Sequence, residues 1–146
     1  MMAEMQDIKI QKKYGNTWVD DTIGGKVCKF RSKGEHKLAK YFELLKQSGH
    51  IKDWEHESHK FTFGNIFSWL IDFTIRNNDD TFEYFEYKGY VEPDTKRKLY
   101  AVAEYYPQAK ITLVMANNKG VKKLGVRATS CCKRVCLLSE LTKGII

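Results

Sequence analysis

The order strand, helix, buried strand within residues 82–115 constrains the fold of this chain more than any other feature. Residues 82–88 are rich in aromatic side chains, which is typical of a strand. Apolar residues then recur every three or four positions, which predicts a helix over about 94–106 that Pro107 ends. The short apolar run 110–115 is suited to a buried strand. Because such crossovers are right-handed and join parallel strands, we expect the two strands to lie parallel in one sheet.

The preceding residues predict one helix and two further strands. Ser32 and Gly49 are start and stop signals for a helix over about 33–47, and Leu38, Phe42 and Leu45 form its apolar stripe. Strands are expected over 51–63 and 69–75, and 82–88 should return antiparallel after the turn 77–80. The predicted fold is α/β, a mixed β-sheet with an α-β-β-β-α-β core flanked by helices. Residues 1–31 predict only short extended pieces.

Composition is that of a globular protein. A chain of 146 residues and 17.0 kDa predicts a single domain, 1–146, with its core at about 31–115. Hydrophobic residues make up 42% of the chain, yet no apolar run approaches the roughly 18 residues of a membrane span. Because residues 1–10 are polar and mixed in charge, we expect no signal peptide or membrane anchor and an intracellular location.

The positive charge is concentrated near the C-terminal end. The formal net charge is +7, and the segment 117–146 has seven basic residues against one acidic residue, so it carries six of these charges. A cluster of this kind favours a polyanionic partner such as DNA. The alternative is a solvated basic tail.

Two strands carry charged residues that could meet at one point. Asp72 lies inside the apolar run 69–75, where a carboxylate is costly to bury without a cation or a hydrogen-bond partner. Glu86 and Lys88 are two positions apart, so they share a face of their strand. Carboxylates from neighbouring strands together with a lysine suit a divalent cation and a phosphodiester.

Whether Asp72 and Glu86 can meet depends on the pairing register of the antiparallel strands 69–75 and 82–88. Facing residues in an antiparallel pair have position numbers with a constant sum. A four-residue loop at 77–80 gives a sum of 157 and puts Asp72 and Glu86 on opposite faces. A sum of 158, from a five-residue loop, puts them directly across from each other, and a β-bulge is the other way to bring them together. We predict the even register.

Four segments in this order resemble the PD-(D/E)XK nuclease superfamily and, within it, small phage-encoded endonucleases and Holliday junction resolvase-like proteins. The segments are residues 31–35, 49–55, 71–73 and 86–90, and the resemblance covers roughly 31–115. It departs from the superfamily pattern at Ile71, where proline is common. The resemblance implies a restriction-endonuclease-like fold and a phage-encoded, Mg²⁺-dependent DNA endonuclease, with Mn²⁺ as a substitute ion.

The resemblance also implies roles for particular residues. Asp72 and Glu86 are the expected metal ligands, Glu35 reaches the ion through water or binds a second one, and Lys88 completes the catalytic set. On the following helix, Lys96 and Tyr100 fit a polar residue and a tyrosine four apart that contribute in related nucleases. The expected DNA contacts are Lys96, Arg97, Lys98, Tyr100, Lys122, Lys123, Arg127, Lys133 and Arg134.

Alternatives remain open at this stage. Branched DNA is the first expected substrate and a homing or restriction-type site the second, with RNA also open. A chain of this size would cut both strands most simply as a homodimer. Each motif also has a plainer interpretation: Ser32-x-x-Glu35 as a capping box, Glu86-x-Lys88 as a solvated strand face, and the whole chain as a non-catalytic nucleic-acid-binding module or a structural phage protein. The cysteines Cys28, Cys131, Cys132 and Cys136 are expected to be thiols, with a zinc site as the alternative.

Overall fold

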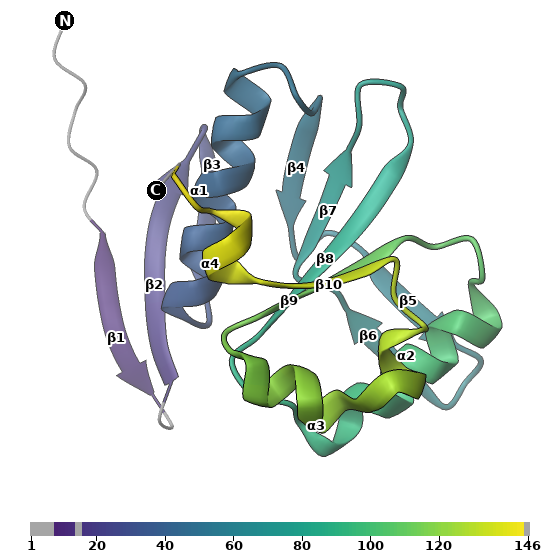
Figure 1. The fold of residues 1–146 in the computed structure, drawn as a ribbon. Helices are drawn as coiled ribbons and strands as arrows, with labels where there is room; N and C mark the ends of the chain where they lie inside the picture. Colours follow the sequence, from purple (N-terminus) through teal and green to yellow (C-terminus); the bar gives the residue numbers. More distant parts are fainter. Residues whose placement is uncertain (1–7, 14–15, 145–146) are drawn as a thin grey trace, which may run out of the picture.

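A five-stranded mixed sheet is the centre of the computed structural model, which describes residues 8–13 and 16–144 (Figure 1). The strand order is β10-β9-β8-β7-β4. The strands are β4 (Asp53–His56), β7 (Phe73–Arg76), β8 (Phe82–Lys88), β9 (Ile111–Met115) and β10 (Arg134–Leu137). β4, β7 and β8 pair antiparallel, whereas β8, β9 and β10 pair parallel. The expected parallel alignment of the strands around 82–88 and 110–115 is therefore confirmed.

One face of this sheet is covered by α1 (Lys33–Gln47), which lies between it and a three-stranded antiparallel sheet (Figure 1). That N-terminal sheet consists of β1 (Lys9–Lys13), β2 (Asn16–Ile23) and β3 (Lys26–Phe30). Leu38 and Phe42 of α1 are buried in a core cluster with Phe73 and Phe85 of the main sheet. The residues before α1 thus form a larger unit than the short extended pieces expected; the parts of this segment at 1–7 and 14–15 lie outside the described residues.

The other face is covered by α2 (Pro93–Tyr105), α3 (Asn118–Thr129) and a small hairpin (Figure 1). The hairpin consists of β5 (Lys60–Phe63) and β6 (Phe67–Leu70). A second core cluster fills this side, with Leu99 of α2 and Leu124 of α3 against Ile111 and Leu113 of β9. Strand β9 is buried along its whole length, as expected for a strand with a core on each face.

The expected α-β-β-β-α-β order is confirmed, with the β5–β6 hairpin inserted between its first and second strands. Two strand predictions are wrong in detail. Residues 51–63 form two strands in different sheets, β4 and β5, because the chain turns at Glu57, whose φ is 51°. Residues 69–75 are likewise divided, since β6 ends at Leu70 and β7 begins at Phe73. Asp72 therefore lies in the break between two sheets.

The even register is confirmed. Phe73 faces Phe85 and Arg76 faces Phe82, so the position numbers sum to 158. A five-residue loop, 77–81, joins the strands. Phe42 of α1 packs against both Phe73 and Phe85, with ring centroids 5.1 and 4.9 Å away. A slip by one residue would turn these rings out of the core, so the core holds the register.

The basic segment is folded rather than a solvated tail as far as residue 144. It contains α3, β10 and α4 (Leu138–Leu141); Ile145 and Ile146 lie outside the described residues. Cys28 belongs to the first core cluster, whereas Cys131 and Cys132 pack against the second. Among the described residues, no helix is both long enough and apolar enough to span a bilayer.

Candidate active site

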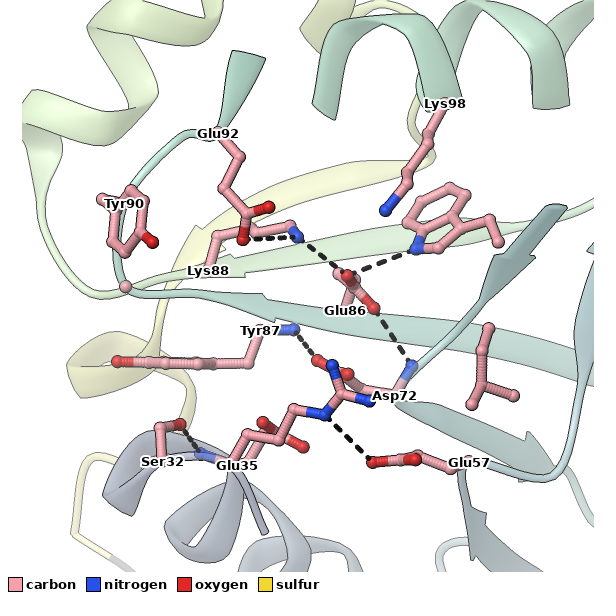
Figure 2. A pocket seen from close by; sticks show the side chains of 14 residues that line it. Ser32, Glu35, Glu57, Asp72, Glu86, Tyr87, Lys88, Tyr90, Glu92 and Lys98 are labelled. Carbon is pink, nitrogen blue, oxygen red and sulfur yellow. Dashed lines mark hydrogen bonds and ion pairs between the residues drawn. The ribbon is translucent and has the colours of Figure 1, made fainter. Parts of the chain in front are cut away.

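A pocket of about 400 Å³ contains all four residues predicted to be catalytic (Figure 2). It lies where the N-terminus of α1, the break before β7 and the second half of β8 meet, and α2 contributes one residue to its wall. The lining residues are Arg31, Ser32, Glu35, Glu57, Trp69, Leu70, Asp72, Glu86, Tyr87, Lys88, Gly89, Tyr90, Glu92 and Lys98. Three separate elements thus bring Glu35, Asp72, and the pair Glu86 and Lys88 to one place.

Asp72 and Glu86 are joined by two hydrogen bonds between their segments. The Asp72 N–H donates to Glu86 Oε1 at 3.0 Å, and the Tyr87 N–H donates to Asp72 Oδ2 at 2.8 Å (Figure 2). Continuing the register of β7 and β8 by one residue places Asp72 across from Glu86. Because Asp72 lies between β6 and β7, its N–H is available for the carboxylate of Glu86. The carboxylates of Asp72 and Glu86 therefore lie on the same side of the sheet.

Glu86 is buried, with 4% of its surface exposed, and is held by polar donors. Lys88 Nζ lies 3.1 Å from Glu86 Oε2, and the indole N–H of Trp69 donates to the same oxygen at 3.3 Å. Glu92, from the loop before α2, lies 3.9 Å from Lys88 Nζ. Lys88 is therefore a buried cation between two carboxylates, which contradicts the interpretation of Glu86-x-Lys88 as a solvated strand face.

Glu35 is also buried, and its carboxylate contacts His56 instead of completing a capping box with Ser32. The Glu35 N–H donates to Ser32 Oγ at 3.1 Å, which is half of the capping box. The carboxylate itself is 3.0 Å from His56 Nε2. His56 Nε2 is in turn 3.4 Å from Glu57 Oε1. Ser32 therefore caps the helix, while the side chain of Glu35 belongs to the pocket.

The pocket has an excess of negative charge that its own cations do not fully offset. Burial raises the pKa of Asp72 well above its ordinary value, and the nearby carboxylates Glu86 and Glu35 raise it further. Burial by itself lowers the pKa of Lys88, but Glu86 outweighs it, so that this pKa lies above the ordinary value. Lys88 is thus held firmly in its charged form.

His56 is the second buried cation. Burial alone lowers its pKa, but contacts with Cys28, Glu35 and Glu57 outweigh that effect and raise the pKa to about 9. Its ring is nearly enclosed, with 6% of the side chain exposed. At neutral pH His56 is therefore an imidazolium that neutralises Glu35 and Glu57.

The donor atoms fit a divalent cation. Glu35, Asp72 and Glu86 supply carboxylate oxygens, which Mg²⁺ prefers. One set of three ligand atoms already lies within 4.8 Å, from Glu35, His56 and Glu57. Within the described ranges, Asp72 and Glu86 belong to no such set of three, so the predicted ligands share a pocket without forming a compact cage.

The structure places the predicted DNA-contact residues in several regions. Of those on α2, Lys98 lines the pocket, as Figure 2 shows, while Lys96 and Tyr100 do not, so the pair expected to join the metal site is not brought to it. Tyr100 instead stacks with Arg127 of α3, with the guanidinium carbon 4.5 Å from the ring centroid. Arg97 is mostly exposed beside Phe67.

The remaining basic residues lie away from the pocket. Lys122 and Lys123 are exposed on α3. Lys133 pairs with Glu83, and Lys133 and Arg134 line a different cavity beside Tyr41 of α1. Their role in DNA binding stays a prediction.

Sequence reasoning missed His56, Glu57 and Trp69. Two other histidines have partners away from the pocket: His36 bonds Asp21 at 2.7 Å, and the ring of His59 lies 4.9 Å from that of Tyr84. A signal for His56 was present: it is two positions after Trp54, so both side chains lie on the same face of β4. Trp54 is fully buried, and His56 follows it into the core.

Comparisons with known proteins give little further information. No protein-family model matches the chain. No curated protein matches it either. Among solved structures, the chain is similar to a repair endonuclease from Pyrococcus abyssi, with 14% sequence identity and a TM-score of 0.39 over 88% of this chain and 63% of that one. The chain therefore spans less than two thirds of that protein. A similarity this low carries no argument about function, which has to rest on the pocket itself.

Proposed function

We propose that this protein is a metal-dependent endodeoxyribonuclease of the PD-(D/E)XK type. The observation that carries the proposal is the meeting of Glu35, Asp72 and Glu86 with the buried amine of Lys88 in one pocket. Four such groups from three separate parts of the fold would be costly to bury together without a function, because each requires a partner for its charge. Their order along the chain also fits the resemblance to the superfamily described above.

The proposed metal ligands are Asp72 and Glu86, with Glu35 as a further ligand or as a partner through water. A divalent ion bound by these oxygens supplies Lewis-acid activation of a phosphate and a water of lowered pKa. Mg²⁺ suits an all-carboxylate donor set, and Mn²⁺ suits the same set. Binding requires Glu86 to exchange some of its present donors, Trp69 and Lys88 among them.

The side chains of the protein have distinct tasks in this proposal. Lys88 is a fixed point charge that stabilises the negative charge that develops on the phosphate and orients the attacking water. The main-chain N–H groups of Asp72 and Tyr87 keep the two strand carboxylates in place. Lys98 reaches the same pocket from α2 and would contact a phosphate next to the cleaved one.

DNA is the proposed substrate, and branched DNA is the first choice. The net charge of +7 favours a polyanion, and the basic residues Lys122, Lys123 and Arg127 on α3 offer further phosphate contacts. Cutting both strands from so small a chain favours a homodimer. The proposed protein is encoded by a phage and acts in the cytoplasm of the host cell.

The test is cleavage of defined DNA by the wild-type protein and by Asp72→Asn. We expect Mg²⁺ or Mn²⁺ to support nicking of a four-way junction, and we expect EDTA or Asp72→Asn to abolish it. Asn keeps an oxygen that accepts from the Tyr87 N–H, so the fold should be retained, and circular dichroism checks this. A linear duplex of the same sequence distinguishes a junction nuclease from a site-specific one. If both proteins bind the DNA and neither cuts it under any of these conditions, the protein is a non-catalytic nucleic-acid-binding module.

A further inference from the structure

A second pocket, of about 450 Å³, lies beside the candidate active site between the β5–β6 hairpin and α2. Its wall is mainly aromatic and apolar, formed by Phe63, Ile66, Phe67, Tyr100, Ala101 and Tyr105. Several of these side chains face solvent: Ile66 is 77% exposed and Tyr105 is 50% exposed. Apolar groups left open in this way, around a concave surface, indicate a ligand with flat, uncharged faces.

Two of the aromatic rings that line this pocket lie close to an arginine, Arg97 of the lining itself and Arg127 of α3 outside it. The guanidinium carbon of Arg97 lies 4.0 Å from the centroid of Phe67, and that of Arg127 lies 4.5 Å from the centroid of Tyr100. Arg97 pairs with Asp94 Oδ1 at 2.7 Å, but 55% of its side chain is exposed, so the guanidinium is still accessible to a ligand. Nucleobases stack on aromatic rings and on guanidinium planes, while the positive charge attracts the neighbouring phosphates. The lining also includes Glu104, which disfavours an anionic ligand in the pocket itself.

The two pockets are lined by neighbouring residues of the same two elements, β6 and α2. Strand β6 contributes Phe67 to the second pocket and Trp69 and Leu70 to the active site. On α2, Arg97 faces the second pocket and its neighbour Lys98 faces the active site. Residues 67–70 span about 10 Å, which is a few nucleotides at about 3.4 Å per nucleotide. A strand with a phosphate beside Lys98 would therefore bring a nearby base to Phe67 and Tyr105.

We propose that this second pocket binds an unpaired nucleobase of the DNA strand whose phosphate enters the active site. The inference rests on the proposed nuclease function and narrows its substrate to DNA with a single-stranded segment next to the cut, as at a branch or a flap. Bases in an intact duplex are stacked inside the helix and cannot enter. The pocket thus gives the enzyme a preference for DNA with unpaired bases rather than for a particular base sequence.

Binding measurements in EDTA test the proposal without cleavage. The probes are a splayed-arm DNA with 2-aminopurine in one arm near the branch, and a blunt duplex of equal length. We expect wild-type protein to bind the splayed-arm DNA more tightly and to change the fluorescence of the 2-aminopurine. Tyr105→Ala and Ile66→Glu should each weaken splayed-arm binding by about tenfold, remove the fluorescence change and leave duplex binding as it was.

Val27→Glu is the matched control, because Val27 is 87% exposed on β3, away from both pockets, and the substitution makes the same change in charge as Ile66→Glu. The proposal is overturned if both variants bind splayed-arm DNA as the wild type does, or if they lose duplex affinity equally. It is also overturned if light scattering shows that Tyr105→Ala converts a dimer to a monomer, since the pocket would then be an interface between copies.

Cleavage assays with metal separate this proposal from the proposed function. If wild-type protein cuts no DNA but the two variants still lose arm binding selectively, the base pocket stands and the nuclease proposal fails. If wild-type protein cuts DNA, Asp72→Asn does not, and both pocket variants bind the arm normally, the nuclease proposal stands and the base pocket fails.

Discussion

The ring of Tyr87 lies directly against Gly34, leaving no room for a side chain there. A Cβ at position 34 would come within 2.1 Å of the Tyr87 ring. Gly34 precedes Glu35 on α1, and Tyr87 follows Glu86 on β8, so this contact joins the two elements that bring carboxylates to the pocket. The close approach of helix and strand depends on glycine at this position.

Gly34→Ala should therefore destabilise the protein and disturb the pocket. Overpacking at such a contact costs about 1–3 kcal/mol, whereas glycine to alanine in an open helix is favourable by up to about 1 kcal/mol. Urea unfolding measures the difference. Adding Tyr87→Ala should relieve the clash, and Gly89→Ala is the control, because a Cβ there would lie 4.0 Å from the same ring. A fully stable Gly34→Ala protein that still cuts DNA would contradict this account.

Asp72→Asn should stabilise the metal-free protein at neutral pH while it abolishes cleavage. The pKa of Asp72 is higher in the folded protein than in the unfolded chain, so ionisation of this group opposes folding. The loss of folding free energy begins as the pH rises above the ordinary pKa of an aspartate and grows from there. Removing the charge should gain on the order of 1 kcal/mol at pH 7.5. At pH 3, where both states are protonated, the difference should vanish. Denaturant curves in EDTA at the two pH values provide the measurement.

Divalent metal should stabilise the wild-type protein and not Asp72→Asn. A ligand that binds only the folded state, present at one hundred times its Kd, adds about 2.7 kcal/mol. Thermal unfolding with EDTA, Mg²⁺, Mn²⁺ and Ca²⁺ measures the shift in Tm. Equal shifts for the two proteins would show that Asp72 does not bind the ion.

Replacing His56 by an uncharged residue should make the free energy of unfolding less dependent on pH. The pKa of His56 is raised from 6.5 to about 9, so its contribution is fully present below about pH 6.5 and is lost as the pH rises through about 9. The contribution is on the order of 3 kcal/mol, at about 1.4 kcal/mol per pKa unit. His56→Gln should therefore lose much less stability than the wild type between pH 6 and pH 9. Guanidinium unfolding at these two pH values, in EDTA, compares them.

Lys88→Gln should slow cleavage by about 10²–10³-fold while DNA binding persists. The amine lies 3.1 Å from Glu86, so its loss also leaves a buried carboxylate with fewer donors. Single-turnover cleavage gives the rate, and anisotropy in Ca²⁺ gives the affinity. Lys98→Gln is a useful comparison, because Lys98 lines the same pocket without contacting Glu86, and a smaller loss is expected there.

Much of the core could be predicted from the sequence because its signals are local and periodic. The apolar stripe Leu38, Phe42 and Leu45 indicated α1, the signals Ser32 and Gly49 gave its ends, and the aromatic run before Lys88 marked β8. Parity of position numbers decided which register brings Asp72 and Glu86 together. These predictions needed only backbone periodicity and the requirement that one face be buried.

The failures have a different physical origin. The breaks at Glu57 and at Ile71–Asp72 depend on which sheet each half of the segment joins, and this is set by distant strands rather than by local pattern. Lys98, rather than Lys96, lines the pocket, and this depends on how α2 packs in the fold, which the local sequence pattern does not give. His56 was overlooked because a histidine gives no sign of its charge until its carboxylate neighbours, Glu35 and Glu57, are placed beside it.

The register of β7 and β8 is held by Phe73 and Phe85 in the core rather than by the loop 77–81 that joins the strands. That loop can consequently lengthen or shorten during evolution without displacing Asp72 relative to Glu86, since the surplus or missing residues would be absorbed outside the paired strands. Relatives of this protein are therefore best recognised by the number of residues from Asp72 to Phe73 and from Phe85 to Glu86, and not by the distance in sequence between the two acids.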